Sequence, residues 1–343
     1  MSQAVVETPT AAGRLLRNAD FLHLWAAQTI AQFGNQVTVI ALPLAAVGLG
    51  ASPFQMGVLG AFQFVPYLAF GLLVGVWADR VRRRPLLASA SFGRGVLLLL
   101  VPASALLGLL RLETLFGVAL LVGSLALLFD VAYTALLPSL VRREQLVEAN
   151  SRLNASLATA QIAGPGLSGL LVQLLTAPIA IAADAFAFLL TGLLVRRIRA
   201  TETIDAGGRR NVRRDLVEGL RAVWGRPVLR AISMSQLSCN IFISANLAVF
   251  VVFMVRVEHM TPVMIGAVYA VGSAGGLAGS LLAPRVARRL GVGPTVVASL
   301  VVIGLAATAT ALPAGPPLVA TAGLALAMLV WQVASGLFAI NAV

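Results

Sequence analysis

The sequence has no lysine, a single cysteine and few charged residues of any kind. Of its 343 residues, 25 are arginine and 13 are acidic, and charged residues make up 11% of the chain. A soluble domain usually has about a quarter of its residues charged, so this chain lacks the polar side chains that a water-exposed surface needs. Cys239, as the one cysteine, excludes an intrachain disulfide and a cysteine metal site.

Apolar residues take the place of the missing charges and make up 59% of the chain. They form runs of about twenty residues or more, which is the length that a helix needs to cross a membrane, and a helix satisfies its own backbone in lipid. We therefore predict an all-α polytopic membrane protein. The ten expected spans are 21–48, 54–78, 85–109, 112–139, 151–175, 177–196, 228–255, 262–284, 293–313 and 316–343.

The arginines lie in alternate loops between these spans. All of them except Arg94, Arg111 and Arg256 fall in the N-terminal tail, in the loops after the second, fourth, sixth and eighth spans, or at the edges of those loops. Loops rich in positive charge stay on the cytoplasmic side, so we expect a multi-pass protein of the cell inner (plasma) membrane with a cytoplasmic N-terminus. The net charge of +12 then reflects membrane orientation and not nucleic-acid binding.

A polar stretch, residues 196–227, separates two halves of the chain that resemble each other. The segment 18–36 matches the region that begins at Pro227, and the second and fourth spans match the eighth and tenth at similar offsets. We therefore expect two parallel six-helix repeats. Residues 1–195 would form the first six-helix bundle, 196–227 a cytoplasmic linker with an amphipathic helix, and 228–343 a second bundle. Because that second repeat holds only four spans, we expect its last two helices to be missing.

The loop between the second and third spans interrupts the apolar chain with one aspartate and four arginines. Its sequence, GVWADRVRRRPLL, resembles the signature loop of the major facilitator superfamily through Gly75, Asp79, Arg80, Arg83 and Arg84. Arg82 stands where that motif often has glycine. The resemblance implies a major facilitator fold and a gating loop, in which charge contacts of Asp79 hold one of two alternating states.

Two further segments, 130–171 and 215–232, resemble bacterial efflux members of that superfamily, of the enterobactin-exporter and macrolide-efflux type. Within the first segment, the run AGPGLSG resembles the fifth-helix motif of proton-coupled antiporters. The matching residues are Gly164, Pro165 and Gly169, and Ser168 stands in place of a glycine. The alternative explanation for these small residues is close helix packing.

Three ionisable side chains are expected inside the membrane. Arg94 and Asp130 lie at about the same depth, ~14 Å, on adjacent spans, which predicts an ion pair that acts either as a structural clamp or as a switch. Asp184 lies in the sixth span without an obvious basic partner at its depth. It is either a proton carrier or a hydrogen-bonded aspartate near the outer surface.

Uncharged polar side chains form stripes along three spans. Each stripe occupies one face of its helix; the residues are Gln28, Gln32 and Asn35 on the first span, Gln63 and Tyr67 on the second, and Gln236, Asn240 and Ser244 on the seventh. Such side chains face a bundle interior or a cavity. We therefore expect a substrate cavity, with hydrogen bonding between helices as the alternative. Its few fixed charges would favour an amphipathic substrate.

The sequence contains no nucleotide-binding P-loop, zinc-protease or serine-hydrolase motif, so we expect a protein that is not an enzyme and that uses no cofactor or metal. The expected function is proton-coupled secondary export, by alternating access, of a small amphipathic compound of the drug, macrolide or siderophore class. Its partners are then the small-molecule substrate, protons and the lipid bilayer, and it acts as a monomer. The alternatives are a truncated non-transporting scaffold or relic, and a facilitator-type importer.

Overall fold

The computed structural model describes residues 15–78, 81–199, 250–310 and 315–341, together with a few single positions between 221 and 234. The regular structure in these residues is helical. Nine helices in them are long and apolar enough to cross a membrane, and each corresponds to one predicted span. The prediction of an all-α polytopic membrane protein is therefore confirmed.

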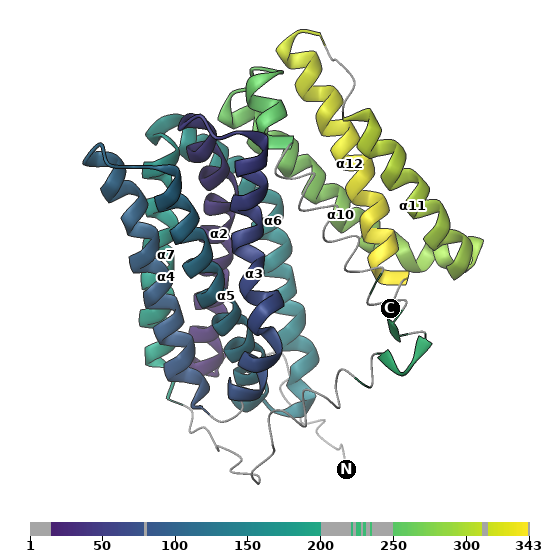
Figure 1. Cartoon of the computed structure of the whole chain (residues 1–343). Coiled ribbons are helices and arrows are strands. Elements are labelled where there is room, and N and C mark those ends of the chain that lie inside the picture. The colour runs from purple at the N-terminus through teal and green to yellow at the C-terminus, as the bar shows by residue number, and fades with distance from the viewer. Residues whose placement is uncertain are drawn as a thin grey trace, which may run out of the picture.

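Six of these helices form a bundle, and three form a second group beside it (Figure 1). The bundle consists of α2 (Ala19–Gly48), α3 (Pro53–Ala78), α4 (Arg83–Leu106), α5 (Leu112–Leu140), α6 (Leu146–Leu175) and α7 (Ala177–Arg197), with the short 3-10 helix η1 (Arg143–Gln145) before α6. The second group consists of α10 (Pro262–Leu290), α11 (Val292–Ala309) and α12 (Pro317–Asn341).

The helices extend beyond the predicted spans mainly at the start of α6 and the end of α10. There the helix continues through polar residues, because hydropathy marks the apolar part of a helix and not its whole length. The predicted seventh span, 228–255, lies mostly outside the described residues, and its last turns are helical from residue 250. The count of ten spans, the two missing helices and the domain limits stay predictions.

The start of α2 is tied to the ends of two other helices. The Asn18 side chain caps α2, because its Oδ1 accepts hydrogen bonds from the backbone N–H groups of Asp20 and Phe21. Its Nδ2 donates to the carbonyl of Leu140 at the end of α5, 2.8 Å away. Asp20 accepts a hydrogen bond from the backbone N–H of Arg199, just after α7. These contacts gather three helix termini at the lower end of Figure 1.

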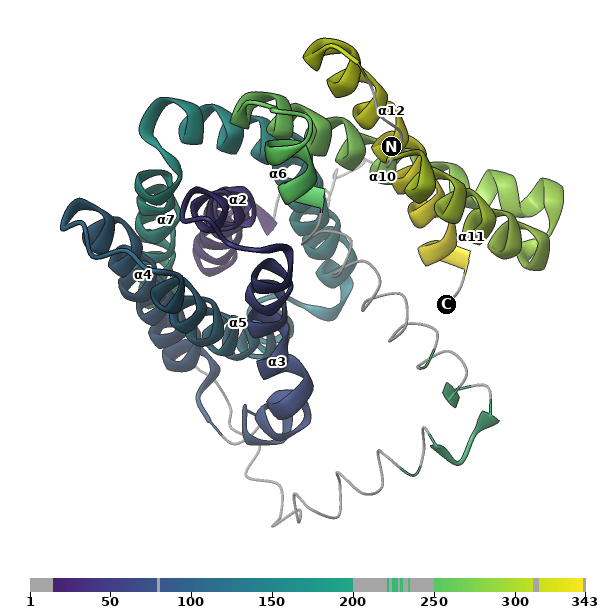
Figure 2. The ribbon, with the colours of Figure 1, turned by 45° about the horizontal axis from the view of Figure 1, so that its top comes forward.

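Viewed from above, α2 lies inside the bundle, packed against α6 and α7, with α3, α4 and α5 around it (Figure 2). A single helix therefore presents side chains to several neighbours at once. One face of α2 meets α7, and another faces the space toward α3 and α5. This position explains why α2, together with α5, contributes most of the residues that line the cavity described below.

The two helix groups touch near the upper end of Figure 1. Gly169 of α6 lies against the backbone of Pro262, and Gly266 of α10 lies against the carbonyl of Pro165. The backbone N–H of Val263 donates to Gln173 Oε1 over 3.4 Å. From this contact α10 runs away from α6 toward the other end of the molecule.

A second contact lies at the same end and joins the helical residues 250–256, which precede α10, to the six-helix bundle. Arg256 Nη2 donates a hydrogen bond to the carbonyl of Ala51, 2.8 Å away. Ala51 is fully buried, in the short connection between α2 and α3. The contacts that join the groups among the described residues thus lie at the end of the molecule opposite to the start of α2.

Candidate functional site

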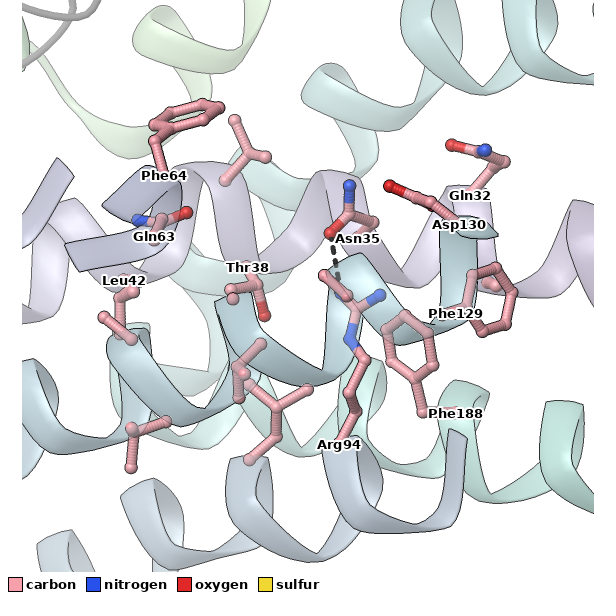
Figure 3. Close-up of a pocket in the computed structure, with 18 of the residues that line it drawn as sticks. Gln32, Asn35, Thr38, Leu42, Gln63, Phe64, Arg94, Phe129, Asp130 and Phe188 are labelled. Carbon is pink, nitrogen blue, oxygen red and sulfur yellow. Dashed lines mark hydrogen bonds between the residues drawn. The ribbon is translucent and has the colours of Figure 1, made fainter. Parts of the chain in front are cut away.

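A cavity of about 240 Å³ lies inside the six-helix bundle, lined by side chains from α2, α3, α4, α5 and α7 (Figure 3). Its lining contains all five polar-stripe residues predicted on the first two spans and two of the predicted membrane charges. These are Gln28, Gln32, Asn35, Gln63, Tyr67, Arg94 and Asp130. The stripe residues therefore share one space, although they come from two helices.

The stripe predicted on the seventh span falls in a part of the chain that the structure does not describe. Gln236, Asn240 and Ser244 lie outside the described residues, so their place opposite α2 stays a prediction. On α2 itself the helical period has the expected effect. Gln28, Gln32 and Asn35 recur at intervals of four and three residues and all reach the same cavity.

Arg94 is the buried cation of the site. Its side chain is 6% exposed, and Nη2 donates to Asn35 Oδ1 over 3.2 Å. The guanidinium carbon lies 3.7 Å from the centre of the Phe188 ring, which is the geometry of a cation–π contact. Arg94 of α4 is thus held between Asn35 of α2 and Phe188 of α7 (Figure 3).

Asp130 lies on α5, and its side chain is exposed to the cavity side. Tyr67 of α3 donates its hydroxyl to Asp130 Oδ2 at 2.6 Å. Among the described residues no ion pair within 4.0 Å joins Arg94 to Asp130, so the predicted pair is not formed in this conformation. Equal depth on two neighbouring helices does not make two side chains face each other.

Asp184 is fully buried in the contact between α2 and α7. A Cβ atom at Gly34 would lie 2.5 Å from Asp184 Oδ1, so that only glycine leaves room for this carboxylate. Neither carboxylate oxygen has a hydrogen-bond partner within the normal geometric limits among the described residues. Thr38 of α2 and Arg94 of α4 are its polar neighbours, and Arg94 attracts it electrostatically.

One expectation for Asp184 is corrected by this placement. It does not lack a basic group at its depth, although it lies seven residues after the start of α7, nearer to the upper end of that helix than to its lower end. Asp184 lies thirteen residues before the end of α7, and Arg94 lies eleven residues after the start of α4. Because α4 and α7 are antiparallel neighbours, both side chains lie about 17–20 Å from the lower end of the bundle.

The arginines of the signature loop contact the ends of two other helices. Arg83 Nη1 donates to the carbonyl of Ala135 on α5 at 2.8 Å, and Arg84 Nη2 donates to the carbonyl of Arg196 on α7. Gly75 lies near the end of α3 with open space beside it. Asp79 and Arg80 lie outside the described residues. The gating role of this loop stays a prediction.

The small residues of α6 allow close packing on two sides. A Cβ at Gly164 would meet the Gln36 side chain of α2, whereas Pro165 and Gly169 approach α10 as described above. Ser168 is fully buried, and its hydroxyl donates to the carbonyl of Gly164. The packing alternative for this run is therefore observed, and its role in antiport stays a prediction.

Sequence analysis missed several residues that line the cavity. Thr38 continues the α2 stripe three residues after Asn35, so the helical period could have identified it. The aromatic residues Phe64, Phe129 and Phe188 also line the cavity. They could not be identified from the sequence, because an aromatic side chain in a membrane helix serves equally well against lipid.

Known proteins are similar to this chain in sequence. The sequence model of the Major Facilitator Superfamily matches residues 24–343. The multidrug efflux pump Tap of Mycolicibacterium fortuitum is 27% identical over 316 residues, which cover 87% of this chain and 74% of that protein. The multidrug efflux pump Tap of Mycobacterium tuberculosis is 28% identical over 309 residues, which cover 84% and 71%.

Solved transporter structures have the same fold. The nucleoside transporter NupG aligns with a TM-score of 0.72 at 14% identity, covering 94% of this chain and 80% of that one. A bacterial homologue of the human lysosomal transporter Spinster, in an inward-facing conformation, aligns with a TM-score of 0.69 at 14% identity, covering 93% and 74%. A family match over nearly the whole chain and nine membrane-length helices lead to one conclusion: the chain is a multi-pass membrane transporter that belongs to the major facilitator superfamily.

Proposed function

We propose that this transporter exports small amphipathic compounds of the drug, macrolide or siderophore class, driven by the proton gradient. The observation that carries the proposal is the cavity inside the bundle. Amide side chains from α2 and α3 provide hydrogen bonds, and Phe64, Phe129 and Phe188 provide apolar wall. A mixed lining of this kind suits a ligand with an apolar body and a few polar groups. The similarity to Tap multidrug efflux pumps supports the outward direction.

The lower end of the molecule in Figure 1 is proposed to face the cytoplasm. The arginines at the start of α4, in η1 and at the end of α7 lie at this end, and positive loops remain cytoplasmic. The contacts between the two helix groups at Arg256 and Gly266 would then lie on the outer side. This arrangement corresponds to a carrier that is closed outward and ready to load substrate from within.

Proton coupling is proposed to use Asp184. It is the fully buried carboxylate among the described residues of the bundle, and the cavity-lining Thr38 lies next to it. A buried carboxylate beside a cation gains or loses a proton at a cost that depends on its surroundings. Movement of α2 against α7 changes those surroundings, and this links proton binding to the alternation between states.

The test is transport in inside-out membrane vesicles that contain the purified full chain. A panel of ethidium, a macrolide and a catecholate siderophore is supplied outside, with an imposed inward-acidic proton gradient. We expect accumulation of at least one compound, loss of accumulation with an uncoupler, and loss with Asp184→Asn. If the wild-type protein accumulates no compound of the panel, or if an uncoupler has no effect on accumulation, the proposed function is wrong.

A further inference from the structure

A second cavity, of about 280 Å³, lies between α2 and α6. Its lining includes Trp25, Thr29 and Phe33 from α2 and Arg152, Ala155 and Thr159 from α6, and these side chains are half-buried or exposed. The described residues of α10, α11 and α12 contribute nothing to this lining, and it shares no residue with the cavity inside the bundle. The α2–α6 groove is therefore a separate feature at the surface of the six-helix bundle.

The groove runs along both helices from the membrane surface toward the membrane interior. Trp25 and Arg152 each lie six residues after the start of their helix, which places them about 9 Å from the lower end of the bundle. Phe33 and Thr159 lie about 20 Å from that end. Helices of 30 residues are about 45 Å long, which is the thickness of a bilayer with its headgroups. Arg152 is thus at the depth where phosphates meet hydrocarbon.

Arg152 provides the positive charge of the groove. Its Nε and Nη2 atoms both donate to the same oxygen, Oε1 of Glu148 one turn earlier, over 3.0 Å and 2.9 Å. Nη1 has no hydrogen-bond partner among the described residues. The two side chains are 29% and 25% exposed, and ion pairs so accessible to solvent are weak. The guanidinium can therefore bind another anion, and its planar donors suit a phosphate.

The groove changes from polar to apolar along its length. At the level of Arg152, the indole N–H of Trp25 donates to Ser156 Oγ at 2.8 Å, which fixes the ring as one wall. Further up, the hydroxyls of Thr29 and Thr159 donate to carbonyls of their own helices, so they offer no hydrogen to a ligand. Phe33 and Ala155 complete this upper part. A ligand that fits has an anionic group at one end and an apolar chain at the other.

We propose that the α2–α6 groove binds an anionic phospholipid, with the phosphate at Arg152 and the start of one acyl chain along Phe33 and Ala155. The lower end of the bundle also carries Arg143 of η1 and the arginines that end α7. Such a positive surface favours a lipid with net negative charge over a zwitterionic one. The inference does not depend on the proposed function, because the groove lies outside the proposed substrate site.

Glu148 and the lipid phosphate compete for Arg152 in this arrangement. Glu148→Gln should therefore strengthen lipid binding, whereas Arg152→Gln should weaken it. In the double variant, Glu148→Gln should have no effect, because its influence passes through the Arg152 guanidinium. Ala155→Phe keeps both charges but fills the groove, and it should weaken binding as much as loss of the arginine does.

The test is quenching of Trp25 fluorescence by brominated lipids. The full chain, with its other three tryptophans changed to phenylalanine, is reconstituted in phosphatidylcholine bilayers that contain a small fraction of brominated phosphatidylglycerol or, separately, of brominated phosphatidylcholine. We expect the anionic lipid to quench about fivefold more strongly, which is the effect of one basic residue near a membrane surface. Arg152→Gln should make the two lipids nearly equal.

The controls separate this groove from general attraction and from misfolding. Arg143→Gln removes the same charge from an exposed residue at the same end and should keep most of the preference. A protein that retains only Trp77, which is exposed on α3, should be quenched equally with and without Arg152→Gln. Inorganic phosphate added to the buffer should not relieve quenching of Trp25, because it has no acyl chain to place in the groove.

Four results would overturn the inference. One is equal quenching of Trp25 by the two brominated lipids in the protein with Arg152. Another is a preference that survives Arg152→Gln or Ala155→Phe. A third is an equal loss of preference in Arg143→Gln and Arg152→Gln, which would show attraction to the whole basic surface. The last is relief of quenching by inorganic phosphate, which would show a site for a free anion.

Discussion

At the scale of single residues, the site depends on how buried charges find partners. Arg94 uses an amide, an aromatic ring and the nearby Asp184, and it forms no salt bridge within 4.0 Å in the described part of the chain. Several weaker contacts thus hold the guanidinium in place, and no single strong ion pair does so.

Removing the buried cation alone should destabilise the protein. Arg94→Met keeps an apolar stem of similar length but leaves Asp184 buried without a counter-charge, so we expect a loss of about 3–5 kcal/mol in the free energy of unfolding. The double change Arg94→Met with Asp184→Asn should recover most of this loss. Denaturant unfolding in detergent measures both. Equal stability of the single and double variants would show that the two charges do not interact.

Gly34 makes room for the buried Asp184 carboxylate, so we expect its replacement to lower the stability of the protein. In Gly34→Ala the new methyl group would lie 2.5 Å from Asp184 Oδ1 and 2.7 Å from Ala187 Cβ. We expect the overpacked α2–α7 contact to cost about 1–3 kcal/mol, visible as a lower midpoint of thermal unfolding. Gly117→Ala is the matched control, because no heavy atom lies within 4 Å of its new methyl group. A Gly34→Ala protein as stable as this control would contradict the packing described here.

At the scale of helices, small residues decide which pairs of helices come close. Gly266 and Gly169 allow the backbones of α10 and α6 to come into contact. Gly34 leaves room for the Asp184 carboxylate between α2 and α7. Close contacts of this kind fix the rotation of each helix about its own axis. That rotation in turn decides which side chains face the cavity.

Widening the α6–α10 contact should separate the two helix groups at their upper end. In Gly266→Ala the added methyl would lie 2.5 Å from the carbonyl of Pro165, so α10 must move. We expect disulfide crosslinking between Gln173→Cys and Val263→Cys, in a Cys239→Ser background, to fall well below that of the same protein with Gly266.

The control for this experiment lies on the same helix. In Gly276→Ala the nearest atoms to the new methyl belong to Gln332, at 3.9 Å, which is ordinary contact. Crosslinking should therefore remain at the level of the unsubstituted helix. Equal crosslinking in the two alanine variants would show that Gly266 does not set the distance between α6 and α10.

At the scale of the whole molecule, the two helix groups meet at one end and separate toward the other. The described contacts between them involve Arg256, Gly266 and Gln173, all near the upper end in Figure 1. A carrier that opens alternately to both sides must break such contacts in each cycle, so each contact biases the balance between the two states.

Arg256 should hold the upper end closed. Arg256→Gln loses a charged hydrogen bond to the carbonyl of Ala51, an interaction worth about 1.5–3 kcal/mol. Ala51 is fully buried, so an Ala51→Cys thiol in a Cys239→Ser background should react slowly with maleimide, and at least several-fold faster once Arg256 is changed. Arg111→Gln, an exposed arginine at the start of α5, is the control and should leave the rate unchanged. An unchanged rate in Arg256→Gln would show that this contact does not close the upper end.

The nine described membrane helices, the superfamily and most of the polar residues around the cavity could be predicted from the sequence. These follow from local properties, because the length of an apolar run sets a span and a spacing of three or four residues places side chains on one face. The polar stripe on α2 reached the cavity for that reason. Thr38 belonged to the same stripe and was open to the same argument.

Which of these residues contact one another could not be predicted in this way, because it depends on how the helices pack. Arg94 lies at a depth compatible with both Asp130 and Asp184, and depth is all that the sequence provides. Its contacts in the structure are with Asn35 and the Phe188 ring. They depend on the rotation of α4 against α2 and α7, which is set by contacts between residues far apart in the chain, such as Gly34 with Asp184. Helix rotation is a property of packing, and packing is settled between helices and not within one.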